Sequence, residues 1–154
     1  MKFFVPQFIA LAATGLLAGA FVYGLLNVVP TFYEVPLSVH LSYRTQLMNH
    51  NSITMQSLMV ASIVTPLWYA YVGRSSPLVS VFAVVSGLLA LTCLLVTRFG
   101  NVPINQQIKT WSPDALPGNW MTLLHTWDHF NLVRSLAALG CFLSCILAAL
   151  IRQR

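Results

Sequence analysis

Residues 78–97, LVSVFAVVSGLLALTCLLVT, contain no charged side chain and are long enough to form one membrane-spanning helix. A helix needs about 20 mostly apolar residues to cross roughly 30 Å of hydrocarbon. Three further runs of the chain approach the same length and apolar character. The expected spans are Phe3–Val29, Ser52–Val72, Leu78–Thr97 and Leu132–Ile151. The sequence therefore predicts an all-α integral membrane protein, a four-helix bundle formed by a single domain over residues 1–154.

The composition of the chain favours a bilayer as its solvent. Of the 154 residues, 57% are hydrophobic and 7% are charged, whereas soluble domains carry about 25% charged residues. So few charges could not cover the surface of a water-soluble protein of this size. The net charge of +5 is spread thinly, so nucleic acid is not an expected partner. The first residues resemble a signal peptide, but the apolar run continues to Val29, and we interpret it as an uncleaved first helix.

The charged residues predict an orientation in the membrane. With four spans, both termini and the short turn after the second span share one side. That side carries basic residues and no acidic ones: Lys2, Arg74, Arg152 and Arg154. The other side carries all the acidic residues and histidines, together with the long connection from about Phe99 to Trp120. That other side also carries four basic residues, Arg44, Arg98, Lys109 and Arg134, so the count of basic residues alone is a tie. We expect those four to be engaged in structure, which leaves the basic residues of the first side to favour the cytoplasm. We therefore expect cytoplasmic N- and C-termini, and functional residues at the opposite end.

A polar stripe precedes the second span, in VPLSVHLSYRTQLMNHNSITMQ, residues 35–56. At 100° per residue, one helical face collects His40, Tyr43, Arg44, Leu47, Asn51, Thr54 and Leu58. This helix is therefore expected to extend beyond the membrane, with the stripe facing the bundle. Polar residues at such positions are costly and commonly mark a cavity. Contact between these side chains and lipid phosphates is the alternative.

The helix of the fourth span is also expected to extend outward, in NWMTLLHTWDHFNLVRS, residues 119–135. Trp127, Asn131 and Arg134 share one of its faces. An arginine one turn inside a span costs about 2.5–3.5 kcal/mol unless it is paired or hydrated. We therefore predict that this face lines a pocket rather than lipid.

The opposite face of the same helix raises the possibility of a metal site. His125 and His129 have the i, i+4 spacing that can bind a metal, and Asp128 lies between them. His40 or His50 from the second helix would complete a site with three or four ligands. The alternative is two histidines at a helix end that face lipid headgroups or a neighbouring loop.

Two further patterns resemble a known family. FGNVPINQQI, residues 99–108, follows the third span, and WDHFNLVRS, residues 127–135, enters the fourth. Together with a glycine-rich first helix, GLLAGAFVYG at residues 15–24, they resemble the small four-helix membrane proteins that include the fungal anthrone oxygenases. The matching positions are Asn101, Val102, Pro103, Asn105, Trp127, Phe130, Asn131, Val133 and Arg134. The family often has His after the second motif's asparagine, where this chain has Leu132.

The resemblance suggests roles for these residues. Asn101 and Asn105 are expected to cap the outer end of the third helix and point into a polar chamber, and Pro103 to stop the helix. Arg98 and Arg134 would lie near each other at the pocket mouth, facing a substrate anion, a phenolate or a carbonyl. An amide–arginine network that holds the outer loop is the alternative.

The resemblance implies an oxygenase that converts a hydrophobic anthrone-like or phenolic substrate. This chemistry needs a base, a donor for the oxyanion and a dry aromatic pocket. We expect His129 or His50 to act as the base. Arg134 and Asn131, together with Asn105, are expected to donate hydrogen bonds to the oxyanion. Trp127, Trp120 and Tyr43 are expected to bind the ring system. Arg44, Asn101 and Arg98 complete the predicted substrate site.

Cofactor and assembly stay open at this point. The oxygenation requires no metal, while the histidines leave copper, iron or haem as alternatives. A metal- or haem-binding redox protein and a non-catalytic accessory subunit of a larger membrane complex are the competing functions. A homo-oligomer is a further possibility, because Gly15 and Gly19 form a small-xxx-small pair that suits either packing within the bundle or a dimer seam.

Overall fold

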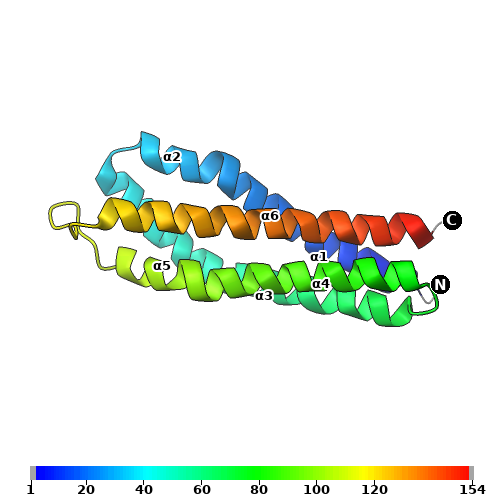
Figure 1. The fold of residues 1–154 in the computed structure, drawn as a ribbon. Helices are drawn as coiled ribbons and strands as arrows, with labels where there is room; N and C mark the ends of the chain where they lie inside the picture. The colour runs from blue at the N-terminus through cyan, green and yellow to red at the C-terminus, as the bar shows by residue number, and fades with distance from the viewer. Residues whose placement is uncertain (1–2, 153–154) are drawn as a thin grey trace.

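The computed structural model describes residues 3–152, which form a bundle of long helices lying side by side (Figure 1). The first helix comprises α1 (Phe4–Tyr23), a π-helical segment (Gly24–Val28) and α2 (Val29–Glu34). The second is α3 (Leu37–Val72). The third comprises α4 (Pro77–Val96), a π-helical segment (Thr97–Asn101) and α5 (Val102–Ile108), and the fourth is α6 (Trp120–Arg152).

The four helices confirm the predicted all-α membrane bundle. Within residues 3–152, each of the four is long and apolar enough to cross a membrane, at 31, 36, 32 and 33 residues. A bilayer core needs about 20 residues. The first and third helices are thus nearly as long as the second and fourth, which the hydropathy of their spans does not predict.

Pro103 does not stop the third helix, contrary to the prediction from the sequence. The chain passes through the π-helical segment Thr97–Asn101 and continues into α5, where Pro103 occupies one of the first positions. Proline is tolerated inside a membrane helix where a local π-helical adjustment accommodates its missing N–H, and such a segment directly precedes α5. The connection to α6 is therefore limited to residues 109–119, and Asn101 and Asn105 lie within the helix instead of capping its end.

The two ends of the described chain lie at the same end of the bundle (Figure 1). The Arg152 guanidinium donates a hydrogen bond to Gln7 Oε1 at 3.2 Å and lies 4.0 Å from the centre of the Phe3 ring. This contact closes the bundle between its first and last helices. The connection 109–119 lies at the opposite end.

Small residues let the helices approach closely. A Cβ added at Gly15 would lie 3.1 Å from the Phe142 ring of α6, whereas one at Gly19 would meet nothing within 4 Å. Ser86 and Ser144 donate hydrogen bonds of 2.8 Å to the carbonyls of Cys141 and Phe82 on facing helices. Buried hydroxyls that bond across helices stabilise membrane bundles. Gly15 therefore serves packing within the bundle.

We predict that the end with Phe3 and Arg152 faces the cytoplasm, because contacts within the bundle engage Arg44, Lys109 and Arg134 at the other end and leave the basic residues of this end to set the orientation. A membrane-impermeant maleimide should label Thr110→Cys from the outside, and Ser75→Cys only after permeabilisation. Native thiols will not interfere, because Cys93, Cys141 and Cys145 are all buried. Labelling of both positions from the same side would contradict the four-span topology.

Candidate functional site

A cavity of about 460 Å³ lies in the half of the bundle that contains α2 and α5. Its size is within the range of roughly 300–1,000 Å³ that is typical of small-molecule sites. The walls come from all four helices. They include four aromatic rings, three methionines and three cations: Phe21, Tyr23, Phe32, Trp127, Met48, Met55, Met59, Arg44, Lys109 and Arg134. The rim adds amides and a hydroxyl from Asn51, Ser52, Gln56 and Gln106.

Trp127 is fixed in the cavity wall by the two sequence motifs acting together. Its indole Nε1 donates a hydrogen bond to Asn105 Oδ1 at 2.6 Å, and its backbone carbonyl accepts one from Asn101 Nδ2 at 3.0 Å. Gly100 packs directly against Phe130, since a Cβ there would lie 2.6 Å from the Phe130 ring. Residues 99–108 and 127–135 therefore form one contact network. The polar element after the third span positions the tryptophan of the fourth.

Arg134 points into the bundle and lines the cavity. Its Nε and Nη2 donate to Asn131 Oδ1 at 3.1 and 2.9 Å, and its Nη1 donates to Thr97 Oγ1 at 3.4 Å. The guanidinium carbon also lies 4.7 Å from the centre of the Phe21 ring, a cation–π distance. Neutral oxygens and an aromatic face thus solvate a charge that would be costly in lipid.

Arg44 approaches the same cavity from α3 and is only 2% exposed. Its Nη1 donates a hydrogen bond to His40 Nε2 at 3.1 Å, because arginine has no acceptor atom. The guanidinium carbon lies 4.1 Å from the Trp127 ring centre and 5.2 Å from that of Phe32. His40 stacks on Phe32 at 5.1 Å, so His40 and Phe32 together hold Arg44 in place.

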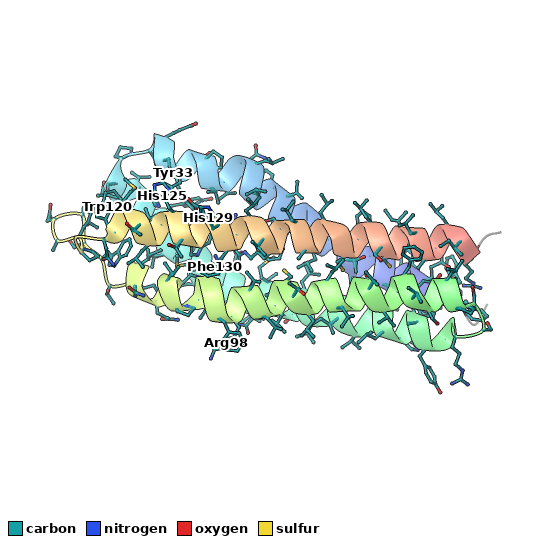
Figure 2. The ribbon with its side chains drawn as sticks, viewed as in Figure 1. Tyr33, Arg98, Trp120, His125, His129 and Phe130 are labelled. Carbon is teal, nitrogen blue, oxygen red and sulfur yellow. The ribbon has the colours of Figure 1, made fainter. Side chains whose placement is uncertain are left out.

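The predicted metal ligands do not form a metal site. Among residues 3–152, no three His, Cys, Asp or Glu side chains come together as ligands. Tyr33 stands among the candidates: its hydroxyl donates to Asp128 Oδ2 at 2.5 Å, and its ring lies 5.7 Å from His40 and 6.5 Å from His125. Figure 2 shows Tyr33 of α2 beside His125 of α6. The candidate ligands therefore contact Tyr33 in place of a shared metal position.

His129 and His50, the two predicted bases, lie outside the cavity lining. Both side chains are exposed, and neither lines the cavity. The His129 Nδ1 hydrogen-bonds within its own helix, to the His125 carbonyl at 2.9 Å. The prediction that one of them acts as the base therefore conflicts with their positions. Periodicity shows which residues share one face of a helix. It does not show whether that face is turned toward the bundle or away from it.

The structure also corrects the predicted positions of Arg98, Tyr43 and Trp120. Arg98 is exposed and points away from the bundle in Figure 2, so it does not lie with Arg134 at a pocket mouth. Tyr43 is 56% exposed and meets Phe32 only edge-on, on the outside. Trp120 is half-buried and packs against an apolar cluster beneath the connection 109–119. Asn101 and Asn131 are buried behind the cavity wall, where they brace Trp127 and Arg134.

Several wall residues were missed by reasoning from the sequence. The spacing of Met48, Met55 and Met59 on one face of α3 is a signal that periodicity could have found. Phe21 lies in α1, where Gln7 and Thr14 are the polar side chains, too few to mark the inner face by a polar pattern. Lys109 follows α5, and its Nζ donates to Asn49 Oδ1 at 2.8 Å. That contact depends on the continuation of the third helix past Pro103, which the sequence did not reveal.

The fold and this cavity define a class of protein, a small four-helix membrane protein with a cationic, aromatic-walled pocket between its helices. The sequence model of the anthrone oxygenase family matches residues 45–144, and the chain belongs to that family. The matched region begins directly after Arg44 and contains both motifs, Trp127 and Arg134. No match was found among curated proteins or among solved structures.

Proposed function

We propose that this protein is a membrane-embedded oxygenase that acts on a hydrophobic aromatic substrate, anthrone-like or phenolic, in the 460 Å³ cavity. The observation that carries the proposal is the pair Arg44 and Arg134, which flank the aromatic wall formed by Trp127. Membership of the anthrone oxygenase family supports the reaction type. The apolar exterior of the helices supports delivery of the substrate from the bilayer.

The reaction that fits this cavity is the oxidation of an activated methylene to a carbonyl. An anthrone has a methylene group between two aryl rings, para-conjugated with its carbonyl, and loss of a proton gives an enolate. Carbon then donates electrons to dioxygen and forms a C–O bond, giving a hydroperoxide. Loss of water leaves a quinone. One oxygen atom of dioxygen becomes the new carbonyl oxygen, and the other leaves as water.

The residues of the cavity are suited to lower the barrier of the first step. Donors aimed at the position where negative charge develops are commonly the largest catalytic contribution. Arg134 and Arg44 would stabilise the enolate oxygen, and the aromatic side chains of Phe21, Phe32 and Trp127 would form an apolar wall for the ring system. Stabilising the enolate increases the acidity of the bound methylene. The proton released from the methylene would leave to solvent buffer through the amide-lined rim beside Asn51 and Gln56, because the two predicted histidines do not line the cavity.

Oxygen-isotope incorporation tests the proposed function. We expect the purified protein in lipid nanodiscs to convert anthrone to anthraquinone under ¹⁸O₂ well above the rate in empty nanodiscs. Each product molecule should contain one labelled oxygen. Empty nanodiscs are the essential control, because anthrones also oxidise slowly without a protein. A rate equal to that of empty nanodiscs, with a folded protein and several ring-substituted anthrones, would refute the oxygenase assignment.

A further inference from the structure

The charged groups that line the cavity are all of one sign. Arg44, Lys109 and Arg134 contribute to its walls, and no Asp or Glu within residues 3–152 does. The hydrogen bonds of the two arginines go to neutral groups, namely His40, Asn131 and Thr97. The carboxylate of Asp128 accepts its hydrogen bond from Tyr33 instead. Asp128 is near enough to Arg44 for its charge to favour the charged guanidinium, but it does not line the cavity. Within residues 3–152, the cavity walls thus bring three cations together with no acidic side chain among them.

Arg44 is the stronger indication that an anion is missing. The side chain is 2% exposed, and only its Nη1 has a hydrogen-bond partner in the described part of the chain. The Nε and Nη2 atoms are buried without any partner among those same residues. Buried polar groups are nearly always satisfied, and an unsatisfied charged donor is especially costly. A ligand oxygen that reaches the wall formed by Arg44 would remove this cost.

Trp127 brings the two arginines close together. The guanidinium carbon of Arg44 lies 4.1 Å from the centre of its ring, and that of Arg134 lies 5.2 Å from it. The distance between the two guanidinium carbons therefore cannot exceed the sum of these two distances. Like charges at such a separation repel each other strongly in a medium of low dielectric constant. A negative charge beside Trp127 would attract both at once.

We infer that the cavity binds its ligand as an anion, with an oxyanion of the enolate, phenolate or carboxylate class held between Arg44 and Arg134 beside Trp127. The inference rests on the proposed function for the aromatic body of the ligand, while the charge preference follows from the arginines alone. The apolar part of the ligand lies along Met48, Met55 and Met59, whose flexible thioethers adapt to ligands of different shape.

An aromatic oxyanion fits the cavity better than the phosphate of a lipid does. The cavity walls combine the two guanidinium groups with the aromatic side chains of Phe21, Phe32 and Trp127, which suit a flat ring system and offer nothing specific to acyl chains. The walls also converge from all four helices on an inner pocket, whereas a headgroup site would lie on the outer surface. Anionic lipid is therefore treated as a competing occupant in the experiment below.

Two matched probes test the inference without requiring turnover. The protein is reconstituted in phosphatidylcholine nanodiscs and titrated with 9-anthracenecarboxylate and with the neutral 9-anthracenemethanol, each followed by its fluorescence. We expect the carboxylate to bind at least about tenfold more tightly than the alcohol after subtraction of partitioning into empty nanodiscs, because hydrogen bonds to charged groups are the strong ones. Equal affinity for the two probes would overturn the inference.

Variants assign the preference to the two arginines. Arg44→Gln and Arg134→Gln should each remove most of the preference for the carboxylate. Arg98→Gln is the matched control, because it removes the same charge from an exposed position outside the cavity and should keep the preference. If the control loses the preference equally, net charge explains it and the site is wrong. Variants that unfold are replaced by Arg44→Lys and Arg134→Lys, for which a clear loss is also expected.

A competition arm separates the two possible sources of the anion. Adding phosphatidylglycerol to the nanodiscs should leave the affinity for the carboxylate within about twofold, once its weaker partitioning into anionic lipid is corrected with empty nanodiscs. Strong competition by phosphatidylglycerol would mean that the anion bound in the cavity is a lipid headgroup and not an aromatic oxyanion. A preference for the carboxylate without anthrone oxidation would refute the oxygenase and keep the anion site. Anthrone oxidation without a preference for the carboxylate would refute the anion site and keep the oxygenase.

Discussion

Replacing Arg134 with lysine is expected to lower anthrone turnover by at least about 100-fold while the protein remains inserted and folded, an effect typical of removing one donor from an oxyanion site. The guanidinium donates two hydrogen bonds to Asn131 and one to Thr97, and its planar shape lets it do so while facing the cavity. A lysine keeps the charge, but its compact ammonium group cannot reproduce this fork. Initial rates in nanodiscs, corrected for empty nanodiscs, measure the effect.

Arg98→Lys is the control for this experiment. It makes the same exchange at an exposed position that does not line the cavity, so turnover should be unchanged. Thermal unfolding of both variants, followed by circular dichroism, tests that the bundle is intact. An Arg134→Lys variant with the turnover of the original protein would mean that a point charge suffices. The oxyanion role of the planar guanidinium would then be rejected.

Much of the bundle could be predicted because bilayer physics leaves few alternatives. A run such as residues 78–97 has no charge and the length of a span, so it has to be a helix whose backbone bonds to itself. The shared face of Trp127 and Arg134 also follows from helical periodicity alone. The cost of an unpaired arginine in lipid then predicts that this face turns inward. Arg134 does line the cavity in the structure.

The course of the third helix was not predictable by the same rules. Pro103 is normally a sign that a helix ends, and the sequence around it is rich in asparagine and glutamine. The structure instead places a π-helical segment, Thr97–Asn101, directly before it. Such single-turn insertions are rare in proteins as a whole, and those that occur are frequently found at functional sites. They depend on packing against neighbouring helices, here of Gly100 against Phe130, which no local pattern encodes.

The histidines show a second limit of reading one helix at a time. Periodicity groups His125, Asp128 and His129 correctly on one face, yet it does not say what that face meets. The partner is Tyr33 of α2, which bonds to Asp128 and stacks on His125. His40 differs, because its hydrogen bond to Arg44 joins two residues of the same predicted stripe on α3. For the histidine face of α6, a contact between helices distant in sequence decides the outcome.

The contact between Gly100 and Phe130 leads to the second large effect. Gly100→Ala is expected to destabilise the bundle by about 1–3 kcal/mol, the usual cost of overpacking a closely packed site. The added Cβ would lie 2.6–2.8 Å from atoms of the Phe130 ring, closer than carbon atoms approach without displacement. The strain acts against the small gain, about 1 kcal/mol, that alanine brings to a helix in place of glycine.

Thermal unfolding in detergent should show this effect as a fall in Tm of several degrees, by the scaling of roughly 2–4 °C per kcal/mol for chains of this length. Gly19→Ala is the matched control, since a Cβ there meets nothing within 4 Å and its Tm should be unchanged or slightly raised. Phe130→Leu combined with Gly100→Ala tests the cause. Because the smaller side chain leaves room for the new methyl group, the double variant should be less destabilised than the two single changes predict together. Strictly additive effects, or a Gly100→Ala protein as stable as Gly19→Ala, would mean that the close approach of α6 to the π-helical segment is not what holds Trp127 and Arg134 at the cavity.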